Sequence, residues 1–268
     1  MFALRQYLFS GTHMLGSSSG TRVLSSPLNL SGLDLWYDAS DIATLFQDNA
    51  GSTPVTANND VVGKMNDKSG NGRHVTQATV SKKPLYKTGI QGGLPAVQFD
   101  ATDDYMSGTA FDPALSWTLF ILFGTLNAKQ GFTGPIACVG ANQGFKIVSS
   151  SSTTLYFRRM ALYSGGAEEA NTYGNTATSL ALPFTPQLFT WRRVSATPPS
   201  LRQNKQDVAV VSQSNSFGTL NLLQLNIYTG TAAAFGMNLC ELLLYNSALS
   251  SYDINRVESY LNRKWGIY

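Results

Sequence analysis

The order of apolar and polar residues along the chain predicts an all-β protein. Residues 117–125, WTLFILFGT, form an unbroken apolar run with aromatic and β-branched residues. Such a run without a helix cap predicts a central strand covered on both faces. Residues 94–99 alternate apolar and polar positions, as half-buried strands do, and residues 187–194, QLFTWRRV, predict a further strand. Residues 236–245, GMNLCELLLY, predict the last long strand, in which Glu241 stands among apolar neighbours.

Shorter strands are expected between these segments. They fall at residues 61–65, 135–139, 144–148, 154–160, 207–212 and 220–228, and a first strand begins at Leu33. In that first strand Leu35 and Tyr37 should share one face, and Trp36 and Asp38 the other. Residues 163–178 are rich in Gly, Ala and Asn and predict a loop.

One helix is expected at the C-terminal end of the chain. Ser250 and Asp253 resemble a capping box with Asp in the place of Glu. The apolar residues that follow recur at helical spacing: Ile254, Val257, Leu261 and Trp265. About ten to twelve strands, one helix and no βαβ alternation together predict a two-sheet antiparallel jelly-roll sandwich with a C-terminal amphipathic helix.

Two domain parts are expected, an arm over residues 1–32 and a globular domain over residues 33–268. The arm contains no acidic residue and includes the linker-like run GSSSG at residues 16–20. Its apolar residues are candidates for an anchor that orders against another subunit: Phe2, Leu4, Tyr7, Leu8 and Phe9. A disordered tail is the alternative.

Composition narrows the function classes. The chain has 268 residues, 43% of them hydrophobic and 13% charged, which suits one turn-rich β domain. A formal charge of +3 is too small to indicate nucleic-acid binding. No apolar run reaches the roughly 18 residues of a membrane span, and no signal peptide is evident. Cys138 and Cys240 are either neighbours in the sandwich or two buried free thiols, and two cysteines without a disulfide framework favour free thiols.

Several short motifs carry a resemblance to a known family. Asp67-x-Ser69-Gly70-Asn71-Gly72-x-His74 is followed by residues 93–105, GLPAVQFDATDDY. Leu35-Trp36-x-Asp38 stands at the start of the domain, and residues 241–246, ELLLYN, lead into a helix that ends at Lys264-Trp265-Gly266. The chain resembles, over about residues 33–268, the concanavalin A-like, laminin G-like jelly-roll family in the version common in phage and bacterial surface proteins.

That resemblance implies a function outside the cell. We expect a phage virion structural protein on the particle surface, a lectin-like adhesion module of a tail fibre, a baseplate or a capsid decoration. It would bind host or environmental glycans weakly, gain avidity as a homo-oligomer or in many copies, and contact other virion proteins through its arm. A structural capsid cement without a ligand is the alternative, and a polysaccharide-degrading glycoside hydrolase is the second alternative.

The acidic residues do not suggest catalysis. Retaining glycosidases need two carboxylates about 5 to 5.5 Å apart, which acidic residues at i and i+2 on one strand can supply. The four glutamates show no such pattern, because Glu168 and Glu169 are adjacent in sequence and Glu241 and Glu258 each stand alone. His74 and His13 belong to no nucleophile or zinc motif. We therefore expect no enzyme.

Calcium is the one cofactor for which the sequence offers ligands. Many laminin G-like domains hold this ion at the sheet rim, and it prefers oxygen ligands on turns. The candidate ligands are Asp67, Asn71, Asp100, Asp103 and Asp104. Asp-rich turns also bond to their own backbone, which is the commoner case.

A glycan site needs aromatic platforms beside amide and carboxylate groups on loops. The candidates are Tyr105, Asn142, Tyr163, Asn171, Tyr173, Asn175 and Tyr228. Each of them taken alone is more often part of the scaffold, and a tyrosine-rich surface also suits a protein interface.

Overall fold

The structure is a computed structural model of the chain, and it describes most of the domain. The described residues are 24–100, 102–112, 115–126, 132–138, 144–149, 158–164, 167–171, 184–195, 199–209, 211–212, 222–225 and 236–268. For residues 132–138, 144–149, 158–164, 167–171, 211–212 and 222–224 only the backbone is described.

Two antiparallel sheets make up the body, and we name the first the helix-side sheet. Its eight strands are β1 (Leu33–Asp38), β5 (Leu85–Gln91), β6 (Leu94–Asp100), β8 (Trp117–Thr125), β13 (Gln187–Arg193), β14 (Ser200–Gln203), β15 (Gln206–Val208) and β18 (Gly236–Tyr245). They run in the order β15-β14-β13-β8-β18-β6-β5, and β1 pairs with the second half of β18. The helix-side sheet therefore collects the most apolar strands of the chain.

The second, outer sheet has ten strands among the described residues. They are β2 (Leu45–Phe46), β3 (Lys64–Met65), β4 (Val75–Thr76), β7 (Met106–Phe111), β9 (Phe132–Cys138), β10 (Gly144–Ser149), β11 (Arg158–Ser164), β12 (Ala167–Asn171), β16 (Val211–Ser212) and β17 (Leu222–Leu225). Their order is β16-β12-β11-β10-β9-β17-β7-β4-β3-β2. Three short 3₁₀ helices join the strands: η1 (Pro27–Asn29), η2 (Ile42–Thr44) and η3 (Val80–Lys82).

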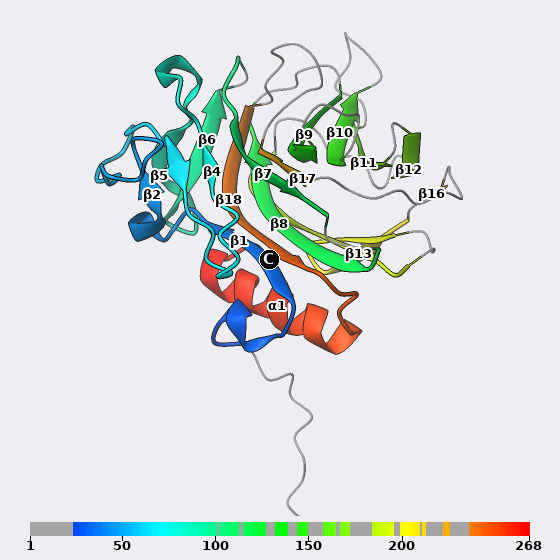
Figure 1. The fold of residues 1–268 in the computed structure, drawn as a ribbon. Coiled ribbons are helices and arrows are strands. Elements are labelled where there is room, and N and C mark those ends of the chain that lie inside the picture. Colours follow the sequence, from blue (N-terminus) through cyan, green and yellow to red (C-terminus); the bar gives the residue numbers. More distant parts are fainter. Residues whose placement is uncertain are drawn as a thin grey trace, which may run out of the picture.

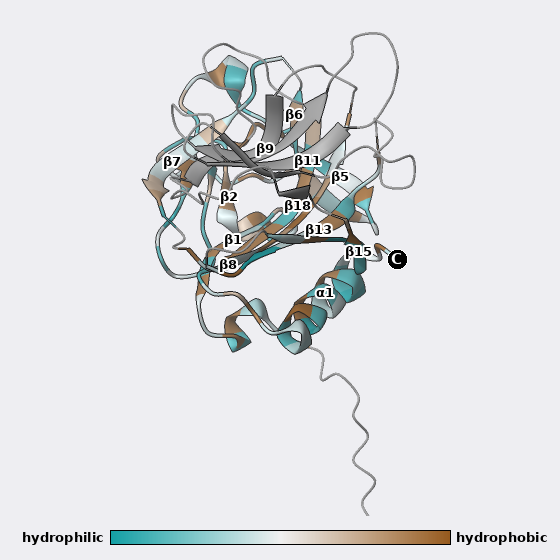
Figure 2. Ribbon diagram, turned by 90° about the vertical axis from the view of Figure 1, so that its right-hand side faces the viewer, coloured by the Kyte–Doolittle hydropathy of each residue, from teal (hydrophilic) through white to brown (hydrophobic). Residues whose placement is uncertain are grey.

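Three layers follow from this arrangement. The outer sheet and the helix α1 (Ser251–Trp265) lie on opposite sides of the helix-side sheet, as Figure 1 and Figure 2 show. Alternate residues of β8 face the two sides: Leu119 and Ile121 belong to the core between the sheets, while Phe120 and Leu122 belong to the core beneath α1. Every residue of β8 is buried, so the prediction of a strand covered on both faces is confirmed.

A β-bulge breaks the alternation of β18. Leu239 and Leu242 both belong to the core between the sheets, which two residues of odd separation cannot do in a regular strand. The register of β18 against β8 shifts between Leu239 and Glu241. A bulge adds one residue and re-aims the side chains beside it. Cys240 and the carboxylate of Glu241 are therefore both on the α1 side.

The helix α1 begins and ends as its sequence predicts. The Ser250 hydroxyl accepts a hydrogen bond from the Asp253 N–H at 3.1 Å, which satisfies a donor of the first turn. Gly266 adopts the left-handed conformation and caps the C-terminal end. The four apolar residues predicted for the buried face, Ile254, Val257, Leu261 and Trp265, are all buried.

Residues 24–32 pack on the domain although the sequence placed them in the arm. Leu24 is buried in the core beneath α1, and its carbonyl accepts a hydrogen bond from Arg263 at 2.9 Å. The Tyr245 hydroxyl donates to the Pro27 carbonyl at 3.1 Å. The packed body therefore begins no later than Leu24. The five anchor candidates of the arm lie outside the described residues.

Some sequence expectations need correction. Residues 167–171 form β12, where a loop was predicted, because pairing with β11 and β16 outweighs the low β-propensity of this polar segment. Of the strand predicted at residues 154–160, residues 158–160 belong to β11, and residues 154–157 lie outside the described residues. Cys240 is a buried free thiol beneath α1, whereas Cys138 lies in β9 of the outer sheet.

Within the described residues, no helix is long and apolar enough to cross a membrane.

Candidate functional site

The loop between β6 and β7 is the place where the structure brings predicted calcium and glycan residues together. Asp100 ends β6, and its Oδ1 accepts hydrogen bonds from the Thr102 N–H at 2.7 Å and the Asp103 N–H at 3.3 Å. Ligand atoms of Asp100, Asp103 and Asp104 all lie within 4.8 Å of one another. We call residues 100 and 102–105 the rim loop.

Asp104 is the buried member of this acidic group. Its Oδ2 accepts the Asp100 N–H at 2.9 Å, and the side chain is buried, unlike that of Asp100. Burial raises the pKa of Asp104 to about 7, and the charges of Asp100 and Asp103 add to this rise against the opposing hydrogen bond. Three crowded carboxylates are a donor set that suits Ca²⁺, which would relieve their repulsion.

Tyr105 is the glycan candidate that belongs to the rim loop. Its N–H donates to the Lys82 carbonyl at 3.3 Å, and its carbonyl accepts from Gln77 Nε2 at 3.0 Å. The Lys82 ammonium lies 5.7 Å from the centre of the Tyr105 ring. The backbone of Tyr105 is thus held from two sides, its side chain is partly buried, and in the sequence it directly follows Asp103 and Asp104, whose carboxylates can accept hydrogen bonds from hydroxyl groups.

Asp67 and Asn71 form a separate structural turn. Asp67 Oδ1 accepts the N–H groups of Trp36 and Ser69, and Oδ2 accepts the Ser69 hydroxyl and the Arg73 N–H, at 2.7 to 3.1 Å. Asn71 Nδ2 donates to the carbonyl of Leu33 at 3.1 Å. These bonds join the turn to β1, and Asp67 is not part of the acidic group of the rim loop. The five candidate calcium ligands therefore divide into two groups, of which the rim loop keeps three.

The other glycan candidates do not join the rim loop in the described structure. Tyr163 and Asn171 lie in β11 and β12 of the outer sheet, so the expectation that Asn171 lies in a loop is wrong. The remaining four lie outside the described residues: Asn142, Tyr173, Asn175 and Tyr228.

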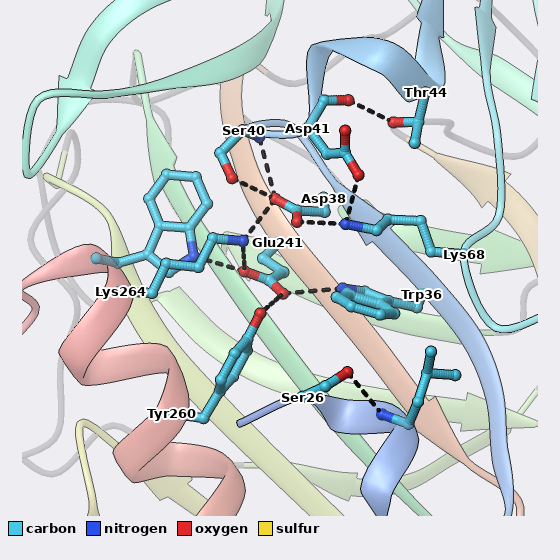
Figure 3. A network of polar contacts seen from close by, with 12 residues as sticks. Ser26, Trp36, Asp38, Ser40, Asp41, Thr44, Lys68, Glu241, Tyr260 and Lys264 are labelled. Atoms are coloured by element: carbon cyan, nitrogen blue, oxygen red, sulfur yellow. Dashed lines mark hydrogen bonds and ion pairs between the residues drawn. The ribbon is translucent and has the colours of Figure 1, made fainter. Parts of the chain in front are cut away.

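A buried polar network beneath α1 was missed by the sequence analysis (Figure 3). Glu241 Oε1 accepts Trp36 Nε1 at 2.8 Å, and its Oε2 accepts Trp265 Nε1 and Lys264 Nζ, each at 2.6 Å. Lys264 Nζ also lies 2.6 Å from Asp38 Oδ1. A charged residue in an apolar strand signals a buried partner, and Glu241 gave that signal in the sequence. Its partners could not be named from there, because the bulge sets the direction of its side chain.

The pKa values of the two carboxyl groups in this network shift in opposite directions. Burial raises the pKa of Glu241, the charge of Asp38 adds to the rise, and Lys264 opposes it. Burial alone would also raise the pKa of Asp38, but the charge and hydrogen bond of Lys264, with hydrogen bonds from Lys68 and Ser40, lower it overall. Lys68 Nζ contacts Asp38 at 2.8 Å and Asp41 at 2.7 Å. The network is covered by α1 and forms no open acidic pair.

Comparisons with known proteins support the fold. The sequence matches no protein-family model and no curated protein. The binding domain of botulinum neurotoxin serotype D has a TM-score of 0.56 at 9% identity, over 85% of this chain and 52% of that one. The binding domain of Paraclostridial mosquitocidal protein 1 has a TM-score of 0.54 at 14% identity, over 74% and 50%.

An enzyme structure is similar as well. Trypanosoma rangeli sialidase in complex with 2,3-difluorosialic acid has a TM-score of 0.53 at 11% identity, over 88% of this chain and 33% of that one. The chain thus spans a third to about half of the length of these structures. Identities this low concern the fold alone. The two-sheet antiparallel sandwich with a C-terminal helix is therefore confirmed.

Proposed function

We propose that this chain is a non-catalytic, glycan-binding β-sandwich module displayed on the surface of a phage particle, with the rim loop as its binding site. The glycan part draws support from the fold, from the acidic group of the rim loop and from Tyr105, which follows that group directly in the sequence. An aromatic face packs on the C–H groups of a sugar ring, and carboxylates accept hydrogen bonds from its hydroxyls. The virion part rests on the family resemblance of the sequence motifs.

The chain enters the folded body and reaches the rim loop at opposite ends, and this arrangement would suit display on a particle. Gly92, just before β6, touches the last turn of α1, since a Cβ there would lie 2.6 Å from the Trp265 carbonyl oxygen. Leu24 is bonded to Arg263 in the same turn. β6 runs away from this turn for seven residues, or about 20 Å, before it reaches Asp100. The chain therefore enters the body at one end and the rim loop lies at the other, which suits a module tethered by residues 1–23.

The proposal assigns calcium to the rim loop. Asp100, Asp103 and Asp104 would supply oxygen ligands, with the remaining positions left to water or to hydroxyl groups of the glycan. The ion would neutralise the three carboxylates and help to fix the loop.

The enzyme alternative gains less support from the geometry. Asp38 and Glu241 share the Lys264 ammonium beneath α1, and both side chains are at most 5% exposed. The carboxylates of the rim loop also lie close together, and the proposal assigns them to calcium. A glycosidase needs its two carboxylates on either side of an accessible glycosidic bond.

A glycan-array screen with and without calcium tests the proposal. The wild-type protein should bind a defined glycan class, and Tyr105→Ala should lose at least about tenfold in affinity, as expected for a stacking contact worth about 1.4 kcal/mol. Tyr252→Ala is the matched control, because Tyr252 is 53% exposed on α1. An array without binders, or equal binding by the wild type and Tyr105→Ala, would contradict the assignment.

An electron micrograph of the assembled particle tests the virion part. Display requires the rim loop to face solvent and residues 1–23 to contact another virion protein. A rim loop covered by neighbouring subunits would instead support the cement alternative.

A further inference from the structure

Lys264, Glu241 and Asp38 bring one amine and two carboxyl groups together beneath α1. Lys264 Nζ lies 2.6 Å from both Glu241 Oε2 and Asp38 Oδ1. The Glu241 side chain is fully buried, and Lys264 is 19% exposed. An amine held against a carboxyl group away from bulk water has a geometry in which condensation competes with ion pairing. We propose that Lys264 and Glu241 join in an intramolecular isopeptide bond, with Asp38 as the proton acceptor.

The surroundings of Glu241 provide the electrostatics that such a reaction needs. Trp36 Nε1 donates to Oε1 at 2.8 Å, and the Tyr260 hydroxyl lies 3.3 Å from the same oxygen (Figure 3). Two donors aimed at one carboxyl oxygen stabilise the negative charge that develops there when an amine attacks the carbon. Trp265 Nε1 lies 2.6 Å from Oε2, the oxygen that leaves.

The two carboxylates have different roles because their surroundings differ. Burial and the neighbouring Asp38 raise the pKa of Glu241, which favours the neutral acid, and a neutral acid is a better electrophile than a carboxylate. Asp38 remains the anion, since Lys68 Nζ at 2.8 Å and the Ser40 hydroxyl at 2.6 Å also donate to it. Glu241 is thus the acyl group, and Asp38 is the ionised carboxylate that lies against Lys264 Nζ and can take its proton as the amine attacks.

The reaction balances without any co-reactant. Asp38 accepts one proton from the Lys264 ammonium, and the free amine attacks Cδ of Glu241. A bond forms between Nζ and Cδ, and the bond between Cδ and Oε2 breaks. Oε2 carries the carboxyl proton, takes a second proton from the nitrogen, and leaves as water. The products are a secondary amide, one water molecule and a protonated Asp38, which returns its proton to solvent.

The product would lock the helix to the sheet. Glu241 belongs to β18 and Lys264 to the last turn of α1, so the bond would close a covalent loop over the connection between them. A cross-link that closes a loop reduces the conformational freedom of the unfolded chain, as a disulfide does. A domain exposed outside a cell would thereby keep α1 in place without a disulfide.

Intact-mass spectrometry of the purified full-length protein, denatured after incubation at neutral pH, tests the proposal. The wild-type mass should be lower than the sequence mass by one water molecule. Protease digestion should give one branched peptide in which fragmentation places the link between Lys264 and Glu241. Lys264→Arg keeps the positive charge, lacks the nucleophilic amine, and should show the full sequence mass.

Lys205→Arg is the matched control, because Lys205 is an exposed lysine in the turn between β14 and β15 and does not belong to this group. It should retain the loss of one water. Wild-type protein at its full sequence mass, with no branched peptide after prolonged incubation, would overturn the proposal. A link from Lys264 to Asp38 would overturn the assignment of Glu241 as the acyl group. Because the wild-type measurement decides by itself, poor folding of a variant does not affect the conclusion.

Discussion

Trp36 and Glu241, 205 residues apart in the chain, meet through a hydrogen bond of 2.8 Å between Nε1 and Oε1. This bond connects the first strand of the helix-side sheet to its last strand, which pair side by side. Lys264 and Trp265 add the end of α1 to the same carboxyl group. The first strand, the last strand and the end of α1 are therefore held together by one carboxyl group.

Replacement of Trp36 by Phe tests how much its hydrogen bond to Glu241 contributes to stability. The ring volume is largely kept, but Glu241 loses a donor in a buried site. We expect the free energy of unfolding to fall by about 1 to 3 kcal/mol, the cost of removing the donor of a buried acceptor. Urea denaturation measures this change, and Tyr252→Phe on the exposed face of α1 is a control that should stay within about 0.5 kcal/mol. An unchanged midpoint in Trp36→Phe would show that the bond contributes little.

Gly92 and Gly93 offer a matched pair for backbone strain. Both have positive φ, +56° and +78°, and an alanine Cβ at Gly92 would lie 2.6 Å from the Trp265 carbonyl oxygen, whereas at Gly93 nothing lies within 4 Å. Both alanine variants should lose about 1 kcal/mol from the backbone conformation. Gly92→Ala should lose clearly more, because the hairpin or the end of α1 must move. Equal thermal midpoints for the two variants would contradict the close contact.

The raised pKa of Asp104 should make the stability of the protein depend on pH. Burial raises its pKa to about 7 in the folded state, whereas an unfolded Asp titrates near about 3.9. The folded protein therefore binds the proton more tightly, so this contribution to stability is full below about pH 4 and is lost as the pH rises through 7. Denaturant titrations between pH 4 and 8 should show this loss in the wild type and a flatter profile in Asp104→Asn. If the free energy of unfolding falls equally with pH in both proteins, a group other than Asp104 causes the fall.

The effect of calcium on thermal stability should show whether the ion binds at the rim loop or at the turn that contains Asp67. Calcium at pH 8 should raise the thermal midpoint of the wild type, and Asp103→Asn should reduce that response with little effect on the calcium-free protein. Asp67→Asn should lower the midpoint with and without calcium, because Asp67 accepts four hydrogen bonds that hold the turn against β1. A calcium response that Asp67→Asn removes while Asp103→Asn leaves it intact would place the ion at the turn.

Part of the candidate site was predictable from the sequence. The Asp-rich segment after β6 and Tyr105 were identified because they follow an alternating strand, and the structure places them in one loop. The separation of Asp67 from that group was not predictable, since it depends on hydrogen bonds to β1, which lies about 30 residues earlier. The buried network was missed for a similar reason. Its members appear among the motifs of the family resemblance, but as isolated residues.

Local patterns in the sequence determined the elements themselves. The apolar run of β8, the ten residues of β18 and the capped helix α1 follow from periodicity and capping, which act over a few residues. Only the tertiary structure decided which residues meet. A one-residue bulge turns Glu241 from the core between the sheets toward α1, and the pairing of β1 with β18 brings Trp36 and Asp38 beside it. Such contacts depend on strand order and register, because a shift of one residue reverses the direction of every side chain.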